Sequence, residues 1–197
     1  MCEILEMDNI DKGEVIDLSN QQDKSIFFLK KGTVKIIDSK SDTVKYIVKK
    51  GNIFGELSLQ DTNQSTHEKA IALEDSIICY IEAHRMEKLM EKHKSLKNGI
   101  LKIYGLRIKK LERRLRDLLY KDSASRISDF IKDYILEFGE EEGHKIVAKN
   151  LLSHKDISNL TNTSRQTVSN VMSQLRKDSI IDYNTQYISI LKEPIPT

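Results

Sequence analysis

The chain has 197 residues, of which 39% are apolar, and a formal net charge of +2. This length has room for two small domains, each with its own core. No stretch approaches the roughly 18 uncharged apolar residues of a membrane helix, and the acidic first residues do not resemble a signal peptide. We therefore expect no membrane partner and a cytoplasmic location. Two cysteines, Cys2 and Cys79, are too few for a disulfide framework, a four-cysteine zinc site or a four-thiolate iron–sulfur cluster.

The near-neutral net charge averages segments of opposite sign. Residues 1–83 carry 10 Lys and Arg against 15 Asp and Glu, whereas residues 84–120 carry 12 against 4. Residues 121–143 carry 3 against 7, and residues 144–197 carry 7 against 4. Basic residues therefore concentrate in the second half, which favours contact of that half with a polyanion, although a solvated charged surface has the same composition.

Short strand-like runs follow one another in the first 83 residues. We expect strands at 26–29, 34–37, 44–48 and 77–81, because each run is rich in β-branched and aromatic residues. Gly13, Gly32 and Gly51 recur at a spacing of 19 residues, which is typical of strands that turn at glycine corners. The pattern predicts an antiparallel barrel or roll.

A helical period replaces the strand pattern after Glu82 and continues without a proline to Tyr120. The period predicts one long helix over residues 84–120. Its apolar residues alternate at spacings of three and four, as in a coiled-coil seam, and we expect this seam to pair two parallel helices rather than to cover the chain's own core. The seam residues are Leu101, Tyr104, Ile108, Leu111, Leu115 and Leu118.

The remaining residues alternate between short helices and strands. We expect a helix over 124–138, capped by Ser123 or Ser125 and ended by Gly139, then an acidic turn and a strand near 145–147. Two short helices follow, and the second begins after Ser164. Runs at 180–183 and 187–191, separated by a polar turn, predict a small hairpin or wing.

Residues 151–181 have the pattern of a helix-turn-helix. Ile157, Leu160, Val168, Val171, Met172 and Leu175 are its apolar positions, and small polar residues join the two helices. The second helix exposes residues that suit the edges of bases in the major groove, and Lys155 on the first helix suits a phosphate. The candidate DNA-binding residues are Arg165, Gln166, Ser169, Asn170, Ser164, Thr167 and Lys155.

Two motifs resemble those of the Crp/Fnr regulators. The sequence T-S-R-Q-T-V-S-N at 163–170 is similar to the opening of that family's recognition helix, and G-x-I-F-G-E-L-S-L at 51–59 is similar to its phosphate-binding cassette. The resemblance covers nearly the whole chain from Gly13. It implies a homodimer with a cupin-like β-roll sensor that binds an inverted-repeat operator and acts on RNA polymerase.

The cassette departs from the cyclic-nucleotide-binding relatives in its charges. Gly55, Glu56, Leu57 and Ser58 match, but Thr66 and His67 stand where the resemblance implies an Arg-Ser or Arg-Thr pair. Leu111 and Glu112 stand where cyclic-AMP-responsive relatives have a Thr-Ser pair that reads the base. A buried phosphate without a cation has an uncompensated desolvation cost. We therefore interpret the cassette as degenerate: the segment is retained as part of the fold and does not bind a nucleotide.

The sequence therefore predicts an α+β protein that regulates transcription as a DNA-binding homodimer and does not respond to cyclic AMP. We expect a double-stranded β-helix (the β-roll) over 1–83, a dimerisation helix over 84–120 and a winged helix-turn-helix over 121–197. No spacing of His, Cys or carboxylates indicates a metal site, a cofactor or an enzyme, and the effector is not specified. The alternative is a sensor module for a cyclic nucleotide or haem whose C-terminal domain contacts proteins.

Overall fold

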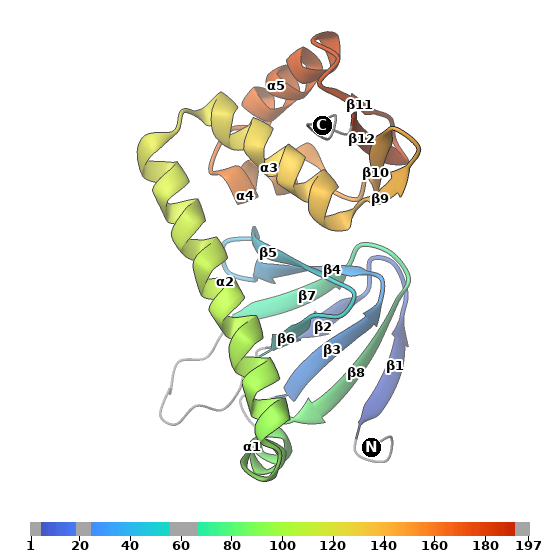
Figure 1. The fold of residues 1–197 in the computed structure, drawn as a ribbon, viewed down its shortest axis with the longest axis vertical. Coiled ribbons are helices and arrows are strands. Elements are labelled where there is room, and N and C mark those ends of the chain that lie inside the picture. The colour runs from blue at the N-terminus through green and yellow to red at the C-terminus, as the bar shows by residue number, and fades with distance from the viewer. Residues whose placement is uncertain (1–4, 19–24, 56–66, 192–197) are drawn as a thin grey trace, which may run out of the picture. The chain divides into compact units, whose positions relative to one another are not determined.

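A computed structural model of the chain describes residues 5–18, 25–55 and 67–191 (Figure 1). The chain divides into two compact units, residues 1–113 and 114–197. In the described ranges no helix is both long enough and apolar enough to span a membrane.

The first unit contains the expected β-roll, made of two antiparallel sheets (Figure 1). The strand order is β1-β8-β3-β6 in one sheet and β2-β7-β4-β5 in the other. The strands are β1 (Glu6–Ile10), β2 (Val15–Asp17), β3 (Ser25–Lys31), β4 (Thr33–Asp38), β5 (Thr43–Lys49), β6 (Ile53–Gly55), β7 (Glu68–Ala72) and β8 (Ser76–Glu82).

The four strands expected from the apolar runs are β3, β4, β5 and β8, and they supply much of the roll's core. Ile26, Leu29, Val34, Ile36 and Ile78 are almost fully buried. The sequence did not indicate β1, β2, β6 or β7. Strand β1 buries only Ile10 and β2 buries no residue fully, so their sequences lack the alternation that marks a half-buried strand.

The glycine corners are confirmed by the backbone. Gly13, Gly32 and Gly51 have φ angles of 88°, 91° and 84°, which side chains with a Cβ rarely adopt. Gly32 has a second constraint, because a Cβ at that position would collide with Ser76.

The expectation of one continuous helix over 84–120 is wrong. The structure has α1 (Ala83–Lys92) and α2 (Lys94–Tyr120), separated at His93, whose backbone is extended. Met86 of α1 and Ile100 of α2 both pack in one cluster with Ile26 and Ile81. In a straight helix these two side chains would be separated by roughly 21 Å along the axis, so the break lets both cover the same part of the roll.

The second unit combines three helices with a four-stranded antiparallel sheet of order β11-β12-β10-β9. The expected hairpin is present as β11 and β12. The elements are α3 (Ser123–Phe138), β9 (Glu140–Glu142), β10 (Lys145–Lys149), α4 (His154–Thr161), α5 (Arg165–Lys177), β11 (Ile181–Tyr183) and β12 (Tyr187–Leu191).

Two local expectations for this unit are wrong. Asp122, rather than Ser123 or Ser125, caps α3, and its carboxylate accepts a hydrogen bond from the backbone N–H of Ser125. The acidic segment after Gly139 is strand β9 rather than a turn, because residues 140–142 pair with residues 145–147 of β10. Cross-strand pairing therefore overrides the low strand propensity of three consecutive glutamates.

Candidate nucleic-acid interface

Helices α4 and α5 form a helix-turn-helix with a side-chain cap at the start of each helix. Ser153 and Asp156 make a reciprocal capping box at α4. Ser164 caps α5, and its hydroxyl accepts a hydrogen bond from the Thr167 N–H at 3.0 Å. Asn162 ends α4 in the left-handed conformation, with φ of 51°. These local bonds fix where α5 begins.

The polar residues predicted on α5 lie together on its outer side. Arg165, Gln166 and Asn170 are exposed and Ser169 is partly exposed. The side-chain amide of Gln166 donates a hydrogen bond from Nε2 to Oδ1 of Asn170 at 3.0 Å. The two amides therefore form one surface unit in the first two turns of the helix.

The other predicted residues differ in what they do locally. The hydroxyls of Ser164 and Thr167 lie 2.8 Å apart, and Ser164 also caps the helix, so both stabilise the first turn of α5. Lys155 is exposed in the first turn of α4. On the inner side of α5, Val168 and Met172 are buried, whereas Val171 is only partly buried.

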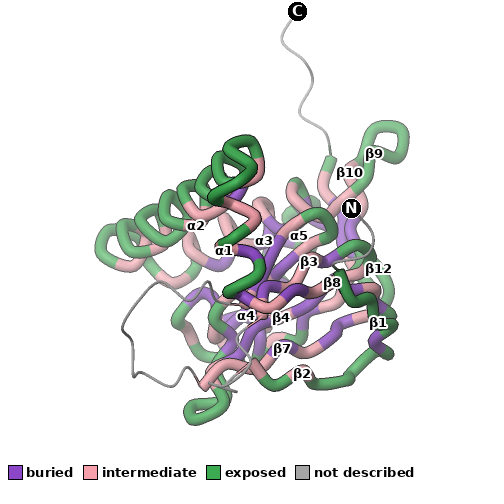
Figure 2. Tube along the Cα trace, turned by 90° about the horizontal axis from the view of Figure 1, so that it is seen from below, coloured by how far each residue is buried: buried purple, intermediate pink, exposed green. Residues whose placement is uncertain are grey.

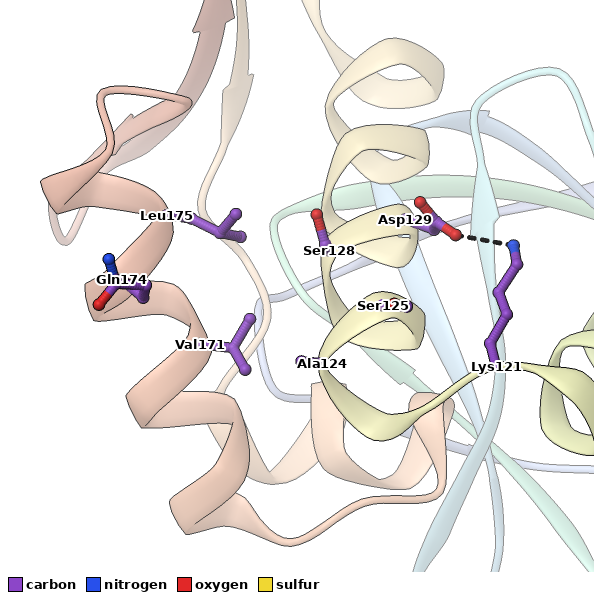
Figure 3. Close-up of a pocket in the computed structure, with 8 residues that line it drawn as sticks. All are labelled: Lys121, Ala124, Ser125, Ser128, Asp129, Val171, Gln174 and Leu175. Carbon is purple, nitrogen blue, oxygen red and sulfur yellow. Dashed lines mark hydrogen bonds and ion pairs between the residues drawn. The ribbon is translucent and has the colours of Figure 1, made fainter.

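Val171 is partly buried because it lines a groove between α3 and α5 (Figure 3). The groove has a volume of about 480 Å³, and Leu175, Gln174 and the first two turns of α3 also line it. At its edge Lys121 contacts Asp129 at 2.7 Å and Asp117 at 2.9 Å. These hydrogen bonds, the one to Asp129 foremost, raise the pKa of Lys121.

The tip of the β11–β12 wing is held by two asparagines. The side-chain oxygen of Asn184 accepts from the backbone N–H groups of Gln186 and Tyr187. Asn150, between β10 and α4, donates through its side chain to the Asn184 carbonyl at 2.6 Å and through its backbone to the Gln186 carbonyl at 2.9 Å. The wing tip is therefore tied to the segment that precedes α4.

Sequence reasoning missed Arg114 and Arg126. Arg114, near the end of α2, donates to the carbonyl of Asn159, and Arg126, on α3, donates to the carbonyls of Thr161 and Asn162. A basic residue on an amphipathic helix usually belongs to a solvated face, so the sequence has no signal that separates these two from other arginines. Only the packing of the unit brings them to the turn.

Most of the predicted effector cassette lies outside the described residues. Glu56, Leu57, Ser58 and Thr66 belong to residues 56–66. Gly55 ends β6 with φ of 85°, and a Cβ there would collide with the carbonyl of Ser25. The backbone carbonyl of His67 accepts a hydrogen bond from the Ser39 N–H at 2.6 Å. The fold of the roll therefore requires a glycine at position 55, whereas the bond at His67 involves only its backbone.

Much of helix α2 is exposed (Figure 2), and several of its large apolar side chains are left uncovered by the residues that the structure describes. Leu101, Ile108, Leu111 and Leu115 are between 54% and 59% exposed. Two predicted seam residues differ, because Tyr104 and Leu118 are partly buried, while Leu119 is 68% exposed. We call Leu101, Ile108, Leu111, Leu115 and Leu119 the outer stripe.

Arg107 of α2 lies over the ring of Tyr46, which belongs to strand β5 of the roll. The guanidinium of Arg107 lies 4.1 Å from the ring centre of Tyr46 and 5.9 Å from that of Tyr104. Burial raises the pKa of Tyr46 to about 12, against the opposing effect of the Arg107 charge. Tyr46 therefore stays neutral, and the Arg107 guanidinium stacks on its ring. Tyr104 is not part of the outer stripe because it packs against the core cluster that contains Ile26 and Ile100.

Comparison with known proteins identifies two domains in the chain, one N-terminal and one C-terminal. The family model of the cyclic nucleotide-binding domain matches residues 7–93, and that of the Crp-like helix-turn-helix domain matches residues 131–194. The global nitrogen regulator of Synechococcus elongatus is 23% identical over 190 residues, which are 94% of this chain and 86% of that protein.

Two solved structures are similar in fold along most of the chain. A CooA variant from Carboxydothermus hydrogenoformans has a TM-score of 0.76 at 21% identity and covers 97% of this chain and 85% of its own. FixK2 from Bradyrhizobium japonicum has a TM-score of 0.78 at 17% identity and covers 96% of this chain and 93% of its own.

A β-roll followed by a long helix and a winged helix-turn-helix defines a DNA-binding transcription regulator with a sensor domain. The two matched domains follow each other in this order and cover most of the chain, and they identify the family of this regulator. The chain belongs to the Crp/Fnr family.

Proposed function

We propose that this regulator binds an inverted-repeat operator as a homodimer and does not respond to cyclic AMP. In this proposal residues 1–83 are the sensor domain, residues 84–120 the dimerisation segment, whose helix α2 makes the contact, and residues 121–197 the DNA-binding domain. The observation that carries it is the outer side of α5, where Arg165, Gln166 and Asn170 are exposed on a capped helix. The location is the cytoplasm, where a bacterial regulator meets DNA and RNA polymerase, its further partner.

The chemistry of α5 supports recognition in the major groove. An arginine at the exposed start of a helix can donate to O6 and N7 of one guanine, and glutamine or asparagine can pair with adenine. In a dimer, two copies of α5 would read half-sites roughly 34 Å apart on one face of the duplex. The operator should then have a guanine in each arm with an adenine close to it.

The outer stripe of α2 supports the dimer. Five large apolar side chains at heptad-like spacing are exposed, and a parallel partner helix would bury them. Replacing Leu111 with Lys places two like charges across the proposed contact. Light scattering at micromolar concentration should show a wild-type dimer and a Leu111→Lys monomer. A wild-type monomer would contradict the assignment.

Selection of duplexes from a random pool by the purified protein tests DNA recognition directly. The expected product is an inverted repeat, and binding to random duplex should weaken steeply as salt rises, because contacts to phosphate release counterions. If no sequence is enriched and binding is weak and insensitive to salt, the alternative of a sensor module that contacts proteins is favoured.

A further inference from the structure

Three carbonyls at the end of α4 accept hydrogen bonds from two arginines. Arg114 Nη2 donates to the Asn159 carbonyl at 3.1 Å. Arg126 donates from Nε to the Thr161 carbonyl at 3.0 Å and from Nη2 to the Asn162 carbonyl at 3.2 Å. The last carbonyls of a helix lack partners within it and carry partial negative charge, so cations are favoured there.

The same two arginines lie on either side of the connection between α2 and α3. Arg126 also donates from Nη1 to the carbonyl of Lys121, in that connection, at 2.7 Å. One planar guanidinium therefore bonds the connection and the helix-turn-helix turn at the same time, an arrangement that the single ammonium of a lysine does not reproduce. Burial lowers the pKa of Arg114, but an arginine remains charged in a protein.

The turn held by these bonds leads directly into the DNA-reading helix. The Thr163 N–H donates to the Ser158 carbonyl at 3.0 Å, and the next residue, Ser164, is the cap of α5. Arg165 follows the cap. A displacement of Asn162 would thus move the first turn of α5 and the side chains that it exposes.

We propose that Arg114 and Arg126 are positioning residues that clamp the helix-turn-helix turn to the α2–α3 connection, so that the end of α2 sets how α5 approaches DNA. This inference rests on the proposed function for the role of α5. The clamp links the dimerisation helix to the recognition helix without a residue that contacts DNA. A change in α2 reaches α5 through these bonds.

The test compares Arg126→Ala, Arg126→Lys and Arg114→Ala with Arg116→Ala. Arg116 is exposed on α2 and takes no part in the clamp, so its replacement is matched in charge. Circular dichroism and light scattering verify fold and oligomeric state. If Arg126→Ala does not fold, Arg126→Lys and Arg114→Ala carry the same test.

Amide hydrogen exchange of the DNA-free protein is the first measurement. We expect residues 162–168 to exchange about tenfold faster or more in the clamp variants, because bonds to charged groups are lost, and at the wild-type rate in Arg116→Ala. Wild-type rates in the clamp variants would overturn the proposal.

Affinity for the selected operator and for random duplex is the second measurement. The operator-to-random ratio should fall about tenfold in the clamp variants. In Arg126→Lys this ratio should fall although the affinity for random duplex is unchanged. Since lysine keeps the positive charge, such a result would assign the effect to the geometry of the guanidinium rather than to its charge. Ratios equal to that of Arg116→Ala would overturn the proposal. If the wild type itself prefers no sequence, the proposed function fails instead, and the exchange rates still decide whether the clamp exists.

Discussion

The two segments with the strongest motifs, residues 163–170 and 51–59, differ in how far their chemistry depends on the rest of the chain. In the first, the cap, the exposed polar residues and the buried Val168 lie within eight consecutive positions. In the second, a nucleotide site would also need a cation near Thr66 and base-reading residues on α2, where Leu111 and Glu112 stand. The function of a motif can be inferred from the motif alone when all the residues that it needs lie within it. A motif that needs residues elsewhere in the chain can keep its family pattern although those residues, and with them its ligand binding, have changed.

The largest effect should be seen with cyclic AMP. We expect calorimetry to show no binding at micromolar concentrations, because a phosphate without a nearby cation has an uncompensated desolvation cost. Replacing Thr66 with Arg should increase the affinity measurably if the missing cation is the cause. A micromolar or tighter dissociation constant for the wild type would remove the contrast between the two segments.

A smaller effect is expected at the start of the recognition helix. Arg165→Ala should lower operator affinity by about 1 to 3 kcal/mol per half-site more than random-duplex affinity, because the bidentate contact with one guanine is lost in each arm. Lys155→Ala is the matched control and should weaken both duplexes alike and reduce the salt slope. Filter binding at several salt concentrations measures both. An unchanged operator-to-random ratio in Arg165→Ala would mean that α5 does not read bases.

The hydrogen-bonded amides of α5 should act as one unit. In a double-mutant cycle, Gln166→Ala and Asn170→Ala should couple by about 1 kcal/mol in operator affinity. Gln174→Ala is the control, since Gln174 makes a similar bond to Asp178 at the far end of the helix, at 2.8 Å. If the effects of Gln166→Ala and Asn170→Ala are additive, each residue reads its base alone.

The smallest effect concerns the cap of α3. Hydrogen bonds from Ser125, its backbone N–H foremost, lower the pKa of Asp122. The stabilisation is therefore complete above the ordinary pKa of an aspartate and is lost as the pH falls through the lowered value. Asp122→Asn should keep the cap and lose this pH dependence, whereas Asp122→Ala should lower the melting temperature at neutral pH. Thermal unfolding between neutral pH and about pH 3 measures this pH dependence. If the wild type and the two variants have the same melting temperature at every pH, Asp122 does not stabilise α3 as its cap.

Several features could be predicted because neighbouring residues determine them. The cap of α5, the glycine corners with positive φ and the strands β3, β4, β5 and β8 all follow from local sequence and are present. The polar side of α5 also follows from helical periodicity, which needs no knowledge of the rest of the fold.

Other features depend on residues far apart in the chain. The break at His93 has no proline or glycine and results from the packing of Met86 and Ile100 on one cluster. Strand β9 exists through its pairing with β10. The sequence by itself determined the helix-turn-helix and the residues that it exposes. Only the tertiary structure decided that Arg114 and Arg126 hold its turn, because hydrogen bonds between residues 35 to 45 positions apart form only when the helices pack.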